Sequence, residues 1–256
     1  MMNPPRVDCH AHVWDRSCAF VADARYHPDY EATIETYLRV LDAHGVESAI
    51  LVQPSFLGTD NRYLLDCLRA HPDRLRGVSV LSGAESDAEL DDQRAAGVIG
   101  TRFNLVGRDP ALMNAGETQT LLNVLAMKNW QAQVQVDGEH LKGVLAALAP
   151  HDMTIVVDHF GRPDAEASEG VSALLELEGS NAFLKFSAPY RQRCTDLRRH
   201  ARMLARCFGA DRCLWGSDWP WTQFEDALTY REAIAFLEDL IEADDVQTIR
   251  SSRFGF

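Results

Sequence analysis

Two spacings of apolar residues alternate along the chain. Short runs rich in apolar and β-branched side chains are separated by stretches with apolar residues at i, i+3, i+4 and i+7, the spacing of an amphipathic helix. The clearest helical stretches have their apolar positions at Ile34, Tyr37, Leu38 and Leu41; at Leu141, Val144, Leu145 and Leu148; at Leu197, Ala201, Leu204, Ala205 and Phe208; and at Tyr230, Ala233, Ile234, Leu237 and Ile241. The pattern predicts strands separated by helices.

Eight runs have the composition of buried strands, and they cover residues 7–13, 48–53, 75–80, 100–104, 131–136, 154–158, 182–187 and 213–217. Strands that alternate with helices form right-handed β-α-β units, and eight such units in about 250 residues is the usual size of a closed parallel barrel. We therefore predict an α/β fold, a (β/α)8 TIM-type barrel, with residues 1–256 as a single domain. A doubly wound open sheet is disfavoured because no glycine-rich phosphate-binding turn follows any run.

Composition and charge narrow the functional classes. Hydrophobic residues make up 46% of the chain and charged residues 25%, which excludes a disordered chain. The net charge of −13 repels phosphate backbones, so we expect no nucleic-acid partner. No apolar run reaches the roughly 20 residues that span a bilayer, and no signal-peptide pattern precedes the first strand. We expect a cytoplasmic protein without a membrane partner.

The cysteines give no sign of a disulfide framework or a structural zinc site. Six are present, at positions 9, 18, 67, 194, 207 and 213, and no two form a C-x-x-C pair. We expect reduced thiols that pack.

Functional side chains of a parallel barrel lie where the strands end, at their carboxyl termini. Polar residues are concentrated at these points: HAH at 10–12, QPS at 53–55, RFN at 102–104, QVQ at 133–135, DHFGR at 158–162, SAPYR at 187–191 and SDWP at 217–220. A site at this end of the barrel is therefore predicted.

His10, His12 and Asp218 are the first candidates for chemistry. Asp8, His10 and His12 alternate along the first strand, so both imidazoles face the lumen, where they could hold a metal ion or a substrate carbonyl. The alternative is a hydrogen-bonded pair of core histidines. Asp218 ends the last strand, and we expect burial to raise its pKa and make it a general base near neutral pH. The alternative of a helix N-cap is weakened by the Trp219-Pro220 pair that follows.

Four segments, VDCHAHVWD, DHFGRPD, SAPYR and WGSDWPW, resemble the amidohydrolase superfamily, and within it the branch of 2-pyrone-4,6-dicarboxylate hydrolases and related lactonases. VQPSFLGTDN and RFN strengthen the resemblance, which spans nearly the whole chain. It implies that His10, His12, His159 and Asp218 are active-site residues. The tail IRSSRFGF resembles the closing segment of the family, without its Asn-Pro.

The resemblance also bears on metal content. Two-metal members carry a Lys or Glu on strand four and a His on strand five, where this chain offers Arg102 and Gln133 or Gln135. A two-metal site is therefore excluded on ligand count. The resembling branch works without metal, so we expect no required cofactor. The alternative is one zinc or manganese ion held by His10, His12, His159 and Asp218.

Arginines gathered near the strand ends predict an anionic substrate, because guanidinium groups bind carboxylates through two-pronged hydrogen bonds. They are Arg102, Arg108, Arg162 and Arg191. The alternative is that they pair with Asp109, Asp164 or Asp196. Hydroxyl groups expected in the same pocket belong to Tyr26, Ser55, Thr59 and Tyr190, whereas Arg193, Arg198, Arg199 and Arg202 are expected on a solvated helix face.

These features predict a hydrolase that opens the ring of a carboxylated lactone similar to 2-pyrone-4,6-dicarboxylate, with Asp218 activating water and a small anionic lactone as the partner. The alternatives are a metal-dependent non-oxidative decarboxylase of the same superfamily, a sugar-acid lactonase and, more remotely, a non-catalytic acid-binding barrel. No oligomeric state is predicted.

Overall fold

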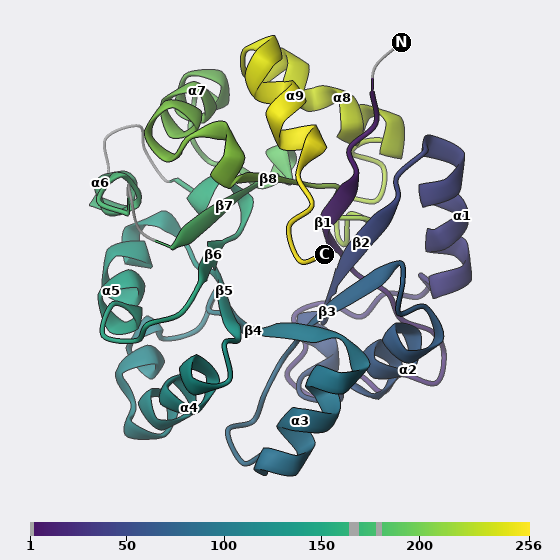
Figure 1. Ribbon diagram of the computed structural model, residues 1–256, viewed down its shortest axis with the longest axis vertical. Helices are drawn as coiled ribbons and strands as arrows, with labels where there is room; N and C mark the ends of the chain where they lie inside the picture. Colours follow the sequence, from purple (N-terminus) through teal and green to yellow (C-terminus); the bar gives the residue numbers. More distant parts are fainter. Residues whose placement is uncertain (1–2, 164–168, 178–180) are drawn as a thin grey trace.

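Eight parallel strands surround a central axis and helices surround the strands (Figure 1). The computed structural model describes residues 3–163, 169–177 and 181–256. The strands are β1 (Val7–Ala11), β2 (Ser48–Val52), β3 (Leu75–Ser79), β4 (Val98–Asn104), β5 (Gln131–Gln135), β6 (Ile155–Val157), β7 (Ala182–Ser187) and β8 (Cys213–Gly216). Each pairs in parallel with the next in sequence order. The predicted (β/α)8 barrel is confirmed, with β1 ending and β4 beginning two residues earlier than expected.

The helices follow the strands in alternation. They are α1 (Ile34–His44), α2 (Arg62–Ala70), α3 (Asp87–Ala96), α4 (Gly116–Met127), α5 (Gly138–Leu148), α6 (Glu169–Leu175), α7 (Leu197–Phe208), α8 (Tyr230–Leu240) and α9 (Ala243–Ser251). Local sequence sets several of their ends: Thr229 and Glu232 form a capping box at the start of α8, and Gly45 ends α1 at φ +70°. In the described part of the chain, no helix is long and apolar enough to cross a membrane.

The barrel closes through the segment after β8. Asp218 N donates to His10 O at 2.8 Å, and His12 N donates to Trp219 O at 2.8 Å. These two hydrogen bonds continue the parallel pairing between the last strand and the first. They also fix the backbone of His10, His12 and Asp218 at neighbouring positions.

A bulge in β1 aims both histidines into the lumen. Asp8 pairs with Ala49 but Ala11 pairs with Leu51, so β1 has one more residue than β2 over this interval. Cys9 packs in the apolar cluster inside the barrel, and His10 follows it on the same side instead of the opposite one. In a regular strand, Asp8 and His10 would point to the same face. The bulge separates them, and Asp8 faces the helix layer.

Buried tyrosines hold Asp8 between the barrel and the helices. Its Oδ2 accepts from Tyr37 of α1 at 2.7 Å and from Tyr230 of α8 at 2.9 Å, and its Oδ1 accepts from Ser217 N at 2.9 Å. This carboxyl therefore ties the start of β1 to the end of β8 and to two helices. Burial raises its pKa despite these donors.

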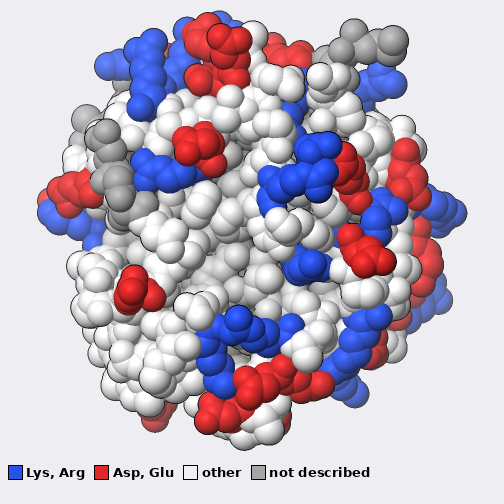
Figure 2. Space-filling model, in the orientation of Figure 1, with Lys and Arg blue, Asp and Glu red and all other residues white. Residues whose placement is uncertain are grey.

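The C-terminal tail covers the end of the barrel at which the strands begin. The Phe254 ring lies 4.6 Å from that of Phe183, and the Arg76 guanidinium lies 4.5 Å from the centre of the Phe256 ring. The tail crosses the middle of the barrel in yellow in Figure 1. Acidic and basic side chains are interspersed around the edge of this face (Figure 2). With this end covered, the far end, where the strands terminate, is left for a site.

Candidate active site

A cavity of about 470 Å³ opens where the strands end. Of the residues expected in the site, nine line it: His12, Tyr26, Ser55, Arg102, His159, Arg162, Tyr190, Arg191 and Asp218. His10 is fully buried and does not itself line the cavity. Arg108 and Thr59 are exposed and do not line the cavity. The site is therefore where the barrel architecture predicts it.

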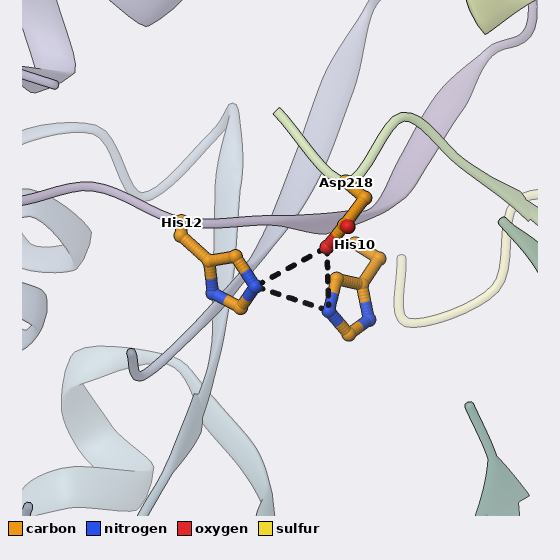
Figure 3. Close-up of side chains that lie close together, drawn as sticks. All are labelled: His10, His12 and Asp218. Carbon is orange, nitrogen blue, oxygen red and sulfur yellow. Dashed lines mark hydrogen bonds and ion pairs between the residues drawn. The ribbon is translucent and has the colours of Figure 1, made fainter. Parts of the chain in front are cut away.

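Two imidazoles and one carboxylate converge on the cavity floor (Figure 3). His12 Nε2 lies 3.4 Å from Asp218 Oδ1 and 3.3 Å from His10 Nε2, and His10 Nε2 lies 3.6 Å from the same carboxylate oxygen. His12 is fixed from behind because its Nδ1 donates to Val52 O at 2.7 Å. The two ends of the barrel sequence thus build one centre.

The two oxygens of Asp218 have different surroundings. Oδ2 accepts hydrogen bonds from Tyr190 OH at 2.5 Å and Arg191 Nε at 2.9 Å, whereas Oδ1 faces the two histidines. Burial alone would raise the pKa of this carboxyl, but the neighbouring Arg191 guanidinium lowers it well below its usual value. The expectation of a raised pKa is wrong. That expectation took account of burial but not of Arg191, whose contact with Asp218 the sequence does not reveal.

His159 forms another part of the cavity wall. Its Nδ1 lies 2.8 Å from Ser187 Oγ at the end of β7, and its ring centre lies 4.7 Å from that of His10. Burial lowers the pKa of His159 to about 3 and lowers that of His10 well below its usual value. Both imidazoles are therefore neutral at ordinary pH.

The backbone bends sharply to present these groups. His159, Ala188 and Asp218 have φ values of +53°, +48° and +58°, in the left-handed region that non-glycine residues seldom adopt. Each follows a strand directly or within two residues. Such conformations cost on the order of 1–3 kcal/mol each and are concentrated at functional sites.

A buried ionic network lies below the floor. Asp158 Oδ2 lies 3.3 Å from Arg102 Nη2, and its Oδ1 lies 3.1 Å from Lys185 Nζ. Burial would raise the pKa of Asp158, but the cations Lys185 and Arg102 lower it well below its usual value. Lys185 was not among the predicted residues. Its signal was its position two residues before Ser187 on β7, which puts both side chains on one strand face.

Each predicted arginine has a carboxylate partner, though not those considered from the sequence. Arg162 Nη2 lies 2.8 Å from Asp137 and Arg108 Nη2 lies 3.6 Å from Asp23, while Arg102 and Arg191 pair with Asp158 and Asp218. Of the alternative partners, Asp109 and Asp196 accept from backbone N–H groups of Ala111 and Arg199, and Asp164 lies outside the described residues.

Arg25, in the loop between β1 and α1, also lines the cavity and was not among the predicted site residues. It forms no ion pair with any residue in the described ranges. Its pKa is lowered by partial burial and by the neighbouring Arg108, Arg102 and Arg162. The charged side chains that line the cavity are five arginines, at positions 25, 102, 162, 191 and 193, and one carboxylate, Asp218. Arg193 also lines the cavity and precedes α7, so its expected place on the helix face is wrong.

Two of the hydroxyl groups expected in the pocket also contact carboxylates. Tyr26 OH donates to Glu225 Oε1 at 2.7 Å, and Tyr190 OH donates to Asp218. Ser55 is half-buried on the cavity wall. Glu225 thus holds the loop that carries Arg25 and Tyr26.

The described residues form two groups of possible metal ligands that share His10. Ligand atoms of His10, His12 and Asp218 lie within 4.8 Å of one another, as do those of His10, Asp158 and His159. Two imidazoles with one carboxylate suit zinc or manganese. The four residues expected for a one-metal site do not form a single group, because His159 falls in the second.

A family model described as amidohydrolase matches residues 7–249. A 2-pyrone-4,6-dicarboxylate hydrolase of Comamonas testosteroni is 30% identical over 240 residues, which are 86% of this chain and 78% of that protein. A 4-sulfomuconolactone hydrolase of Rhizobium radiobacter is 25% identical over 236 residues, 86% of this chain and 77% of that protein.

Solved structures agree with the sequence relatives. A protein of Pseudomonas putida, assigned as a 2-pyrone-4,6-dicarboxylic acid hydrolase, is 36% identical with a TM-score of 0.87, covering 97% of this chain and 95% of that chain. A protein of Acinetobacter baumannii with the same assignment, bound to citric acid, is 32% identical with a TM-score of 0.85, covering 97% and 99%. Because the family model matches almost the whole barrel, the chain belongs to the amidohydrolase family.

Proposed function

We propose that this protein hydrolyses a carboxylated lactone similar to 2-pyrone-4,6-dicarboxylate. The observation that carries the proposal is one cavity with two parts. Its floor holds the ionised Asp218, and its rim gathers cationic side chains around Arg25. A base for water and a set of guanidiniums for spectator carboxylates are what an anionic cyclic ester requires.

Asp218 Oδ1 accepts a proton from a water molecule, and the oxygen of that water attacks the lactone carbonyl carbon. The tetrahedral intermediate then collapses, the ring C–O bond breaks, and the proton on Asp218 passes to the leaving oxygen. The products are a new carboxylic acid and an enol or alcohol on one open chain. Tyr190 and Arg191 keep the carboxylate in place through Oδ2. Proton transfer of this kind contributes roughly 10²–10⁴-fold to a rate.

His159 is assigned to the carbonyl oxygen. We assign Ser187 Oγ, 2.8 Å from Nδ1, as the donor of this hydrogen bond, which places the ring proton on Nε2, where it can stabilise the developing oxyanion. His12 presents an unprotonated Nε2, because its Nδ1 donates to Val52 O, and it therefore accepts rather than donates. His10 is buried below the floor and acts through His12 and Asp218.

The relatives support a lactone substrate. The two curated proteins are named for hydrolysis of a pyrone dicarboxylate and a sulfonated lactone, both anionic. The Acinetobacter baumannii protein binds citric acid, a polycarboxylate. The arginine-rich rim of this cavity suits such ligands.

We propose further that the reaction needs no metal, since the residues of β4 and β5 that would complete a two-metal site are Arg102, Gln133 and Gln135. A single ion, if bound, would be held by His10, His12 and Asp218 and would supply a Lewis acid at the cavity floor.

The test is a kinetic screen on purified protein of measured metal content. Its substrates are 2-pyrone-4,6-dicarboxylate, a sugar-acid lactone, an uncharged lactone and an aromatic carboxylate from which carbon dioxide could be released. We expect ring opening of the dicarboxylate with the highest kcat/KM. Carbon dioxide release that depends on metal would identify a decarboxylase, a preference for the sugar-acid lactone a sugar-acid lactonase, and binding without turnover an acid-binding barrel.

A further inference from the structure

Lys185 is a fully buried cation that the proposed reaction leaves unused. Its side chain extends from β7 into the barrel interior, with an exposed fraction of 0%. Nζ lies 3.0 Å from His10 Nδ1, 2.6 Å from Gln133 Oε1 and 3.1 Å from Asp158 Oδ1. An ammonium group has three N–H donors and no acceptor. The ring nitrogen of His10 therefore accepts a hydrogen bond from Lys185.

This contact determines where the proton of His10 lies. A neutral imidazole carries one proton, so a His10 ring that accepts at Nδ1 is protonated at Nε2. Nε2 lies 3.3 Å from Nε2 of His12, which is unprotonated because Nδ1 of His12 donates to Val52 O. Donors and acceptors therefore match along one direction, from Lys185 through His10 and His12 to the backbone of β2.

The other tautomer of His10, with the proton on Nδ1, also has a hydrogen-bond acceptor nearby. Asp158 Oδ1 lies 3.3 Å from His10 Nδ1 and could accept a proton placed there. Among the described residues, this buried oxygen has ion-pair contacts but accepts no hydrogen bond. Lys185 and Asp158 thus compete for the same nitrogen, one as a donor and the other as an acceptor.

Which nitrogen of His10 carries the proton determines whether His10 can bind a metal cation. A ring nitrogen binds metal through its lone pair, so a proton on Nε2 removes His10 from the group of three ligand atoms on the cavity floor. With the proton on Nδ1, donated to Asp158, all three ligand atoms would be free. The two states differ only in which nitrogen of the His10 ring carries the proton.

We propose that Lys185 is a positioning residue that, through His10, keeps the cavity floor in the arrangement that binds divalent cations weakly. The inference deepens the proposed function and rests on it for its catalytic meaning, namely activation of water by Asp218 alone. Its physical content concerns the proton on His10 and can be measured without any substrate.

The experiment uses histidine labelled with ¹⁵N at one fixed pH. Two-bond ¹H–¹⁵N spectra of the wild type identify the protonated nitrogen of His10, assigned by its loss in His10→Gln. Zinc affinity is then measured by chelator competition for the wild type, Lys185→Met and Gln133→Leu. Gln133→Leu is the matched control, because it removes one hydrogen-bond partner of Lys185 and is expected to keep the hydrogen bond from Lys185 to His10.

We expect the wild-type proton on Nε2, a shift to Nδ1 in Lys185→Met, and an increase in zinc affinity of about tenfold or more in that variant alone, as is typical of changes behind a ligating histidine. A wild-type proton on Nδ1 would overturn the proposal, as would a folded Lys185→Met with unchanged zinc affinity. If circular dichroism shows that Lys185→Met does not fold, the wild-type spectrum decides. Failure to hydrolyse lactones would refute the proposed function and leave these spectra unaffected.

Discussion

Arg191 holds Asp218 by one oxygen only. Its Nε lies 2.9 Å from Oδ2, and its Nη2 donates to Thr222 O at 2.7 Å. The guanidinium is therefore held by both the carboxylate and a backbone carbonyl. Oδ1 is left facing His10 and His12. The carboxylate is thereby fixed in orientation while one oxygen can receive a proton. We therefore expect Arg191 to orient the proposed base, and other arginines to bind the carboxylates of the proposed substrate.

The clearest consequence concerns Asp218→Asn. The amide matches the carboxylate in shape but cannot accept a proton from water, so we expect kcat to fall by roughly 10²–10⁴-fold while KM changes little. Asp66→Asn is a matched control, since that side chain is 77% exposed on α2 and should leave both constants unchanged. A kcat near the wild-type value would show that Asp218 is structural.

Removal of metal should leave the activity intact. Because Lys185 donates to Nδ1 of His10, the ligand group on the floor lacks one lone pair. We expect dialysis against a strong chelator to lower measured metal content without changing kcat. Loss of turnover that zinc or manganese restores would instead assign His10, His12 and Asp218 as ligands.

His10 and His159 should contribute no limb to the pH profile. Burial lowers the pKa of His159 to about 3, and the pKa values of His10 and Asp218 are also lowered. Between about pH 5 and 8, where an ordinary histidine titrates, His10 and His159 stay neutral and Asp218 stays ionised. We therefore expect none of these three groups to produce an acid limb in kcat/KM over this range. An acid limb with its midpoint near 6.5 that persists in His12→Gln would contradict these shifts.

The sequence predicts the fold well because each barrel unit leaves a local signal. Apolar runs mark the strands, and helical spacing places Ile34, Tyr37 and Leu41 on the buried face of α1. Polar residues at strand ends likewise locate the cavity. The bulge in β1 leaves no such signal, because an extra residue in a strand changes the facing of side chains without changing composition.

What the sequence misses depends on contacts between distant elements. Lys185 lies 175 residues from the histidine it contacts, and Arg25 lies in a loop without periodicity. The lowered pKa of Asp218 depends on Arg191, which comes from a different strand end. Strand periodicity gives the face on which a side chain lies, but pairing of charges across a lumen follows only from closure of the barrel.

Arg25 separates an anionic-lactone hydrolase from a sugar-acid lactonase. It lines the cavity without an ion pair in the described part of the chain, so a substrate carboxylate is its natural partner. Arg25→Met should lower kcat/KM for a dicarboxylate lactone by roughly 5- to 150-fold, the equivalent of about 1–3 kcal/mol for one charged hydrogen-bond partner. Arg25→Lys should recover part of this loss, because an ammonium restores the charge but not the planar fork.

Two controls make that result specific. An uncharged lactone should be turned over equally by the wild type and Arg25→Met, since it has no carboxylate to lose. Arg16→Met changes an arginine of the same loop whose side chain is 88% exposed, and we expect no effect on either substrate. Equal losses on the charged and uncharged lactones would mean that Arg25 stabilises the loop rather than the substrate. Among the described arginines that line the cavity, only Arg193 would then remain to support an anionic substrate, because Arg102, Arg162 and Arg191 already have carboxylate partners of their own.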